Sequence, residues 1–187
     1  ALAACCNALE LDVHLTLYGY VVVARDDSAE RMAKLSRRIQ TSAWHEVARW
    51  NIARGFTEDA SVIAHPPLLA DVVDAFGHVP ISVDLKDQTP ALAAAVVAVL
   101  ARAKPEARAH VSLTSFHQRT FGALRKCGYE GPLGMGPLDI LRLWSLPFAR
   151  LGDLQGRAAQ VPTSYRGLEL ATQRFIGKAH ALACRVD

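Results

Sequence analysis

The sequence predicts an α/β fold in which a largely parallel sheet is covered by helices. Short apolar runs that suit strands alternate along the chain with longer runs of helical periodicity, and this alternation is typical of parallel sheets. The chain has 187 residues, enough for one domain with a sizeable core, so residues 1–187 are taken as a single domain.

Strand-like runs are separated by clear helix signals. Thr89 and Pro90 suit the cap and first position of a helix, Gly128 suits a helix end, and Pro147 should end or kink the helix before it. Strands are expected at residues 8–15, 20–24, 79–85, 109–114, 133–136 and 158–161, and helices at residues 68–76, 90–103, 116–127, 139–146 and 168–182. Residues 1–6 resemble the end of a helix and residues 184–187 the start of a strand, so both ends are expected to cut through a longer fold.

One connection is too short for a parallel crossover. Only residues 16–19 separate the first two strands, whereas a crossover needs about a dozen residues or more, so this pair should form an antiparallel hairpin. Residues 25–65 then form an excursion of loops and a short helix. Trp44, Val47 and Trp50 are expected to pack that helix on the body of the domain.

Composition excludes several classes of protein. The net charge is only +3 and the basic residues are scattered, which does not indicate nucleic-acid binding. The most apolar run, residues 91–103, is too short to span a membrane and suits a buried helix. The four cysteines fit neither a zinc motif nor a disulfide scaffold, and no signal peptide is visible, so a reducing, cytoplasmic location is expected.

Glu10, Asp12 and His14 alternate with apolar residues in the first expected strand. Side chains at every second position of a strand share one face, so these three should lie together. Carboxylates on one face of an apolar strand suit a hard divalent cation. From this run alone, a solvated strand face explains the pattern equally well.

A second strand repeats the pattern with Ser82, Asp84 and Lys86, which follow Pro80. Asp84 would add a metal ligand and Lys86 a cation for an anionic substrate, whereas the alternative is a surface ion pair of little energetic consequence. Because the pattern occurs on two strands flanked by helical sequence, a shared site is favoured.

Five stretches of the sequence together resemble the glycerophosphodiester phosphodiesterase family. They are Ala8–Thr16, Val21–Asp27, Leu68–Phe76, Ile81–Lys86 and Leu113–Phe116. They resemble, in order, the family's Glu-x-Asp-Val…Thr strand, its Val-Val-x-His-Asp segment, the helix after its Pro-x-Leu motif, its Ile-Glu-x-Lys strand and its Ser-Phe strand end. The similarity extends over nearly the whole chain.

The resemblance implies a (β/α)8 TIM barrel of the phospholipase-C-like type, with its site at the carboxyl ends of the strands. It implies that Glu10, Asp12 and Asp84 bind Mg²⁺ or Ca²⁺, that Lys86 holds a phosphate oxygen, and that Phe116 contacts the substrate. The implied reaction, a step of lipid metabolism, is hydrolysis of a small glycerophosphodiester to an alcohol and glycerol 3-phosphate.

The sequence departs from the family pattern at the groups that move protons. Arg25 stands where the family has its second histidine, and a guanidinium cannot release a proton at a working pH. Two further segments of the family pattern are not among the matched stretches. The family's His-Arg-Gly segment comes before them in the pattern, and its Trp-Thr-Val-Asn segment comes after them. The resemblance thus implies an incomplete barrel of strands two to six plus a hairpin arm. The strands at residues 8–15 and 158–161 are expected to be its open edges, which favour self-association.

Two interpretations of function therefore remain. The first is a metal-dependent phosphodiesterase, and the second is a non-catalytic relative that binds metal and a phosphate ester without turnover. His14 and His117 are candidate substitutes for the missing proton donor, although a water-exposed histidine and an ordinary first-turn helix residue are the favoured interpretations of these two positions.

Overall fold

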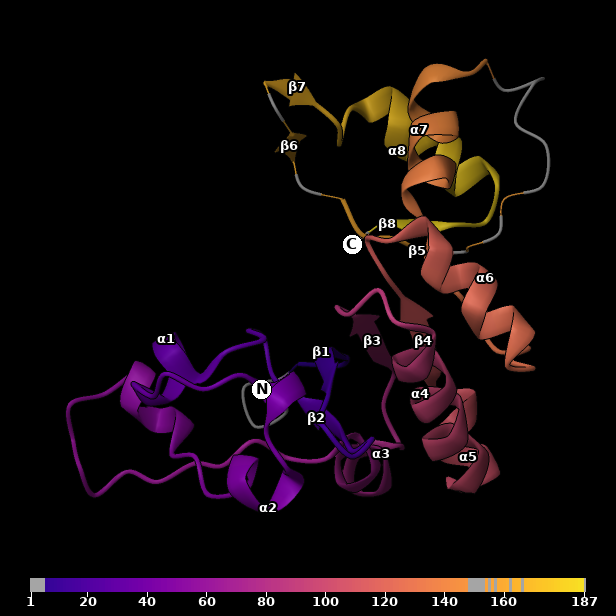
Figure 1. Cartoon of the computed structure of the whole chain (residues 1–187). Coiled ribbons are helices and arrows are strands. Elements are labelled where there is room, and N and C mark those ends of the chain that lie inside the picture. Colours follow the sequence, from indigo (N-terminus) through magenta and orange to yellow (C-terminus); the bar gives the residue numbers. More distant parts are fainter. Residues whose placement is uncertain are drawn as a thin grey trace.

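A four-stranded mixed sheet forms the centre of the protein (Figure 1). The computed structural model describes residues 6–147, 154, 156, 158–161, 163–165 and 167–186. The strands are β1 (Leu9–Leu15), β2 (Val21–Val23), β3 (Ile81–Leu85) and β4 (Val111–Thr114). Their order is β2-β1-β3-β4, and β1, β3 and β4 run parallel to one another. The expected α/β architecture is confirmed.

The predicted antiparallel hairpin between β1 and β2 is present, with Val13 opposite Val23 and Leu15 opposite Val21. The turn closes where the amide of Thr16 donates to the carbonyl of Tyr20, 2.9 Å away, and the Thr16 hydroxyl accepts from the amide of Tyr20 at 3.0 Å. Gly19 adopts a φ of 85°, a conformation that favours glycine, so its position fixes this tight turn.

The parallel arrangement continues beyond β4 through short pairings. Leu133 forms a parallel bridge with Leu113, and Gly134 forms another with Ala158. Ala158 then belongs to β5 (Ala158–Ala159), which pairs in parallel with β8 (Arg185–Val186). The expected strand at 133–136 is thus reduced to isolated bridges. The expectation of a free edge at 158–161 is wrong, because β8 covers it.

Helices cover the apolar face of the central sheet. They are α3 (Leu69–Phe76), α4 (Pro90–Arg102), α5 (Pro105–Ala109) and α6 (Gln118–Lys126). The core between sheet and helices includes Val13, Val83, Leu92, Val96 and Leu113, all fully buried. Alternation along the strands therefore directs the apolar residues outward to the helices and the polar residues to the opposite, inner face.

The excursion after the hairpin packs around its own small core. It contains α1 (Ala29–Ala33), η2 (Ile39–Thr41), α2 (Trp44–Val47) and η3 (Ile52–Gly55). Val47 and Trp50 are buried there together with Val22 of β2, as the sequence predicted. This segment lies at the indigo end of Figure 1, away from the carboxyl-terminal helices.

The carboxyl-terminal part contains α7 (Pro137–Ser145), β6 (Ser164–Tyr165), β7 (Leu168–Glu169) and α8 (Gln173–Ala181). The expected helix at 168–182 begins later than predicted, because Leu168 pairs with Tyr165 in a β-hairpin. Thr172 then caps α8 by accepting a hydrogen bond from the amide of Phe175 at 3.2 Å. The expected helix end at residues 1–6 lies almost entirely outside the described residues. No described helix is long and apolar enough to cross a membrane.

Candidate active site

The polar residues of the parallel strands gather on the inner face of the sheet. Glu10 is in register with Ser82, and Asp12 is in register with Asp84. Asp84 in turn lies opposite Thr114 on β4. Because the strands are parallel, their carboxyl ends meet at one edge, and the side chains that end each strand are brought together.

Three carboxylates converge at this edge. Glu10, Asp12 and Asp84 each offer an oxygen atom within 4.8 Å of the others, as the strand parity predicted. Asp12 and Asp84 are buried, whereas Glu10 lies at the exposed rim. Partial burial, followed by repulsion from Asp12, raises the pKa of Glu10. This cluster is therefore rich in negative charge, and two of its three carboxylates are buried.

Lys86 supplies a positive charge within the cluster. Its Nζ lies 2.8 Å from Oδ1 of Asp12 and 2.6 Å from Oδ2 of Asp84. Burial by itself would lower the pKa of Lys86, but the hydrogen bonds to the two aspartates outweigh it, and the pKa is raised. Lys86 therefore stays protonated and leaves the three carboxylates only partly neutralised.

Arg25 approaches the cluster from the segment after β2. Its Nη1 lies 3.7 Å from Oδ2 of Asp12, while its side chain is 74% exposed. An ion pair this exposed contributes little to stability. The Arg25 guanidinium is thus an exposed cation at the mouth of the site, and it cannot act as a proton donor or acceptor.

His14 is not water-exposed, so the favoured interpretation of this residue is wrong. It is buried, and its Nδ1 lies 2.8 Å from Oδ1 of Asp87. Asp87 also accepts hydrogen bonds from the Leu15 amide at 2.9 Å and from the Gln40 side chain at 2.8 Å. The loop after β3 thus folds back to hold the His14 ring through Nδ1, while Nε2 of His14 is buried without a hydrogen-bond partner among the described residues.

Phe116 lies beside the cluster, at the end of β4. It is 63% exposed, and its ring lies 5.5 Å from Nζ of Lys86, within range of a cation–π contact. His117 follows it as the residue that precedes α6, and its amide donates to the Ser115 hydroxyl at 3.2 Å. Phe116 therefore belongs to the mouth of the site, and His117 is half-buried next to it.

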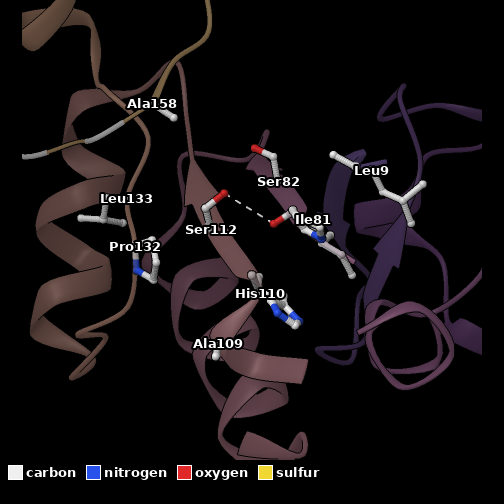
Figure 2. A pocket seen from close by; sticks show the side chains of 12 residues that line it. Leu9, Ile81, Ser82, Ala109, His110, Ser112, Pro132, Leu133 and Ala158 are labelled. Atoms are coloured by element: carbon white, nitrogen blue, oxygen red, sulfur yellow. Dashed lines mark hydrogen bonds between the residues drawn. The ribbon is translucent and has the colours of Figure 1, made fainter. Parts of the chain in front are cut away.

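A different pocket opens at the opposite, amino-terminal ends of the strands (Figure 2). Leu9, Ile81, Ser112 and Leu133 line it, and no carboxylate is among its lining residues. Ser112 there donates to the carbonyl of Ile81, 3.4 Å away. Its one ionisable lining residue is His110, whose Nδ1 lies 2.8 Å from the carbonyl of Gly77. The pocket offers neither a carboxylate for a cation nor a lysine or arginine for a phosphate, so the carboxyl-terminal edge is the candidate site.

Two features of the site were missed by sequence reasoning. The first is the Asp87–His14–Gln40 network, since a loop aspartate carries no signal of the strand it folds back on. The second is an apolar pocket lined by Phe116, Leu141, Trp144 and Leu168, among others. The sequence of α7 could have indicated this pocket. Apolar residues occur on both faces of this short helix and cannot all be buried in one core.

The sequence matches the model of the glycerophosphoryl diester phosphodiesterase family over residues 1–181. The chain belongs to this family. The family accounts for the parallel strands with a site at their carboxyl ends, and it implies a TIM-barrel-like fold, of which the four-stranded sheet is an unclosed part. By this membership the protein is a glycerophosphodiester phosphodiesterase.

Solved structures of glycerophosphodiester phosphodiesterases have the same fold. The enzyme from Agrobacterium tumefaciens is 18% identical with a TM-score of 0.73, and the match covers 97% of this chain and 73% of that one. A phosphodiesterase from Oleispira antarctica, solved with its product sn-glycerol-3-phosphate, is 19% identical with a TM-score of 0.72 and coverages of 95% and 70%. A phosphodiesterase domain from Mycobacterium tuberculosis is 14% identical with a TM-score of 0.77 and coverages of 99% and 77%. No curated protein matches the sequence significantly.

Proposed function

We propose that this glycerophosphodiester phosphodiesterase acts through a divalent cation, Mg²⁺ or Ca²⁺, held by Glu10, Asp12 and Asp84. The observation that carries the proposal is the convergence of three carboxylate oxygens within 4.8 Å of one another. Oxygen ligands of this kind suit both ions. The proposed substrate is a small glycerophosphodiester, and the products are an alcohol and glycerol 3-phosphate.

The residues present fit a cation. Oδ1 of Asp84 is buried without a hydrogen-bond partner among the described residues. A buried carboxylate oxygen without a partner is costly, and a cation would remove that cost. Three carboxylates against Lys86 and the exposed Arg25 still leave excess negative charge, which a doubly charged ion would offset.

Each of this chain's residues has a distinct part in the proposed reaction. Lys86, which stays protonated, would hold a phosphate oxygen, and Phe116 would contact the organic part of the substrate. A bound divalent ion would polarise a phosphodiester oxygen and offset charge on the phosphoryl group. Water would then bond to phosphorus as the phosphorus–oxygen bond to the alcohol breaks, and the proton lost by the water would pass through solvent to the leaving alkoxide.

Proton transfer is the weak point of this arrangement and supports the second candidate function. Arg25 takes the family's histidine position, and loss of general acid–base catalysis typically slows a reaction about 10²–10⁴-fold. Two histidines are candidate substitutes: His14, whose Nδ1 is held by Asp87 and whose Nε2 has no partner among the described residues, and His117, which follows Phe116. The second candidate is therefore a protein that binds the cation and a phosphate ester with little or no turnover.

Calorimetric titration with Ca²⁺ and with Mg²⁺ tests the cation site. We expect one ion to bind and Asp84→Asn or Glu10→Gln to weaken it at least tenfold. Asp74→Asn is the matched control, because Asp74 is an exposed carboxylate on α3, away from the cluster. Equal affinity in all four proteins would overturn the proposed site.

Hydrolysis of glycerophosphocholine in the presence of each ion separates the two candidate functions. Slow, ion-dependent release of glycerol 3-phosphate that Glu10→Gln abolishes supports the enzyme. Binding of glycerophosphocholine without release supports the non-catalytic relative. Hydrolysis that needs neither the ion nor Glu10 would contradict both.

A further inference from the structure

We propose that the apolar pocket beside the carboxylate cluster binds the alkyl chain of a single-chain glycerophosphodiester, so that the preferred substrates are lysophospholipid-like amphiphiles. This inference rests on the proposed function of the cluster and names the substrate class. The pocket has a volume of about 530 Å³, well within the range of small-molecule sites.

The pocket lies next to the charged cluster. One end is formed by Thr114, Ser115 and Phe116 at the end of β4. Thr114 is the register partner of Asp84, and the Phe116 ring lies 5.5 Å from Nζ of Lys86. A molecule whose phosphate rests on Lys86 would therefore have its organic part at the entrance of the pocket.

The far end of the pocket is apolar and open. It is lined by Leu141 and Trp144 of α7 and by Leu168 of the β6–β7 hairpin. Leu141 is 57% exposed and Leu168 is 55% exposed. The indole N–H of Trp144 donates to the carbonyl of Glu169 at 3.2 Å, which holds this wall against the hairpin. Large apolar side chains at this level of exposure leave surface that an alkyl chain would remove from water.

The chemistry of the two ends selects the occupant. The cluster and Lys86 suit the charged phosphodiester, while Leu141 and Leu168 offer no hydrogen-bond partner and the N–H of Trp144 is already donated to Glu169. Gln160 also lines the pocket, but its side-chain amide donates to Ser82 at 3.0 Å. A sugar or a polar alcohol would leave hydroxyl groups unpaired against the leucines, which costs free energy. An amphiphile with one chain satisfies both ends.

Calorimetric titration in Ca²⁺ tests this pocket with glycerophosphocholine and with hexanoyl, octanoyl and decanoyl lysophosphatidylcholine, each below its critical micelle concentration. We expect affinity to rise up to about fourfold for each methylene that enters the pocket. Leu141→Ser should lower affinity for the decanoyl ligand about fivefold to tenfold and leave affinity for glycerophosphocholine unchanged.

Leu138→Ser is the matched control. Leu138 lies on the same helix and is 47% exposed, but it is not among the residues that line the pocket. Equal losses in the Leu138 and Leu141 variants, or affinity independent of chain length, would overturn the chain pocket while leaving the proposed function intact. Failure of glycerophosphocholine and all three lipids to bind would overturn both. A dimer that dissociates only in the Leu141 variant would show that a second copy of the chain occupies the pocket instead.

Discussion

Arg25 is the residue at which this chain departs most clearly from its family. Its guanidinium lies 3.7 Å from Asp12, close enough to reach the site but unable to exchange a proton. We expect Arg25→His to raise the hydrolysis rate of glycerophosphocholine at least tenfold, because an imidazole restores a proton-transfer group. The change is measured as initial rate in saturating Mg²⁺ or Ca²⁺.

Arg54→His provides the control for that measurement, since Arg54 is an exposed arginine on η3 in the excursion. It should leave the rate unchanged. If Arg25→His also changes nothing, then residue 25 does not occupy the family's histidine position, and the alignment of the segment after β2 must be revised.

Asp87 is expected to stabilise the fold in a pH-dependent way. Burial would raise its pKa, but hydrogen bonds from His14, the Leu15 amide and Gln40 outweigh burial and lower the pKa from 3.8. The stabilisation is therefore complete above pH 3.8 and is lost as the pH falls through the lower folded-state pKa. Asp87→Asn should cost roughly 1–3 kcal/mol of unfolding free energy at neutral pH.

Urea unfolding of the wild type and of Asp87→Asn over a series of pH values checks this. The difference between the two should shrink below pH 3.8, and Asp74→Asn should show no comparable loss. If the difference in unfolding free energy between the two proteins stays constant to the lowest pH measured, the charge of the Asp87 carboxylate does not contribute to stability.

The alternation of side chains along the strands predicted which carboxylates converge, but it did not predict the residues that hydrogen-bond to His14 beside them. Period-two alternation places Glu10, Asp12 and Asp84 on one face, and neighbouring parallel strands then bring them together. The burial of His14 depends on Asp87 and Gln40, which come from a loop and from a short 3₁₀ turn. Such contacts depend on how loops fold back, and no local periodicity encodes that.

At the scale of elements, capping signals located helix α4 accurately. Thr89 caps it by accepting a hydrogen bond from the Leu92 amide at 3.3 Å, and Pro90 takes its first position. We expect Thr89→Ala to lower the free energy of unfolding by about 1 kcal/mol, and Thr89→Ser to restore most of it. Chemical denaturation measures both. Identical stabilities for the alanine and serine variants would show that the cap does not contribute.

The sequence patterns misplaced the elements whose strand pairing involves only one or two residues. Residues 133–136 suit a strand, but only Leu133 and Gly134 form bridges. Residues 168–182 suit one helix, but Leu168 and Glu169 pair with β6 before α8 begins. In the first place single long-range bridges decide the local structure, and in the second a hairpin of two residue pairs does. Propensity summed over a long window detects neither.

At the scale of the whole molecule, the described parallel strands and bridges run from β1 to β8 without closing into a barrel, and antiparallel β2 lies beside β1. Within the described residues, β8 pairs only with β5, and Glu10 and Leu11 pair only with β3. Strand edges of this kind can pair with another chain. We therefore expect a mass that rises with protein concentration in light scattering after size exclusion. A monomer at every concentration would show that these edges are covered.

Stability should be distributed unevenly over this molecule, with the central sheet the last part to open. β3 is paired on both sides, by β1 and β4, and its residues Val83 and Leu85 are fully buried beneath the helices. β5 and β8 share a ladder of only two residue pairs and pack on a separate, smaller core. Since amides exchange through local opening whose cost reflects buried contacts and pairing, β3 amides should be protected longest and β8 amides exchange early. Hydrogen exchange followed by mass spectrometry measures this order directly. Equal protection of β3 and β8 would mean that the two cores open as one cooperative unit. The short ladder between β5 and β8 would then be as stable as the centre of the sheet.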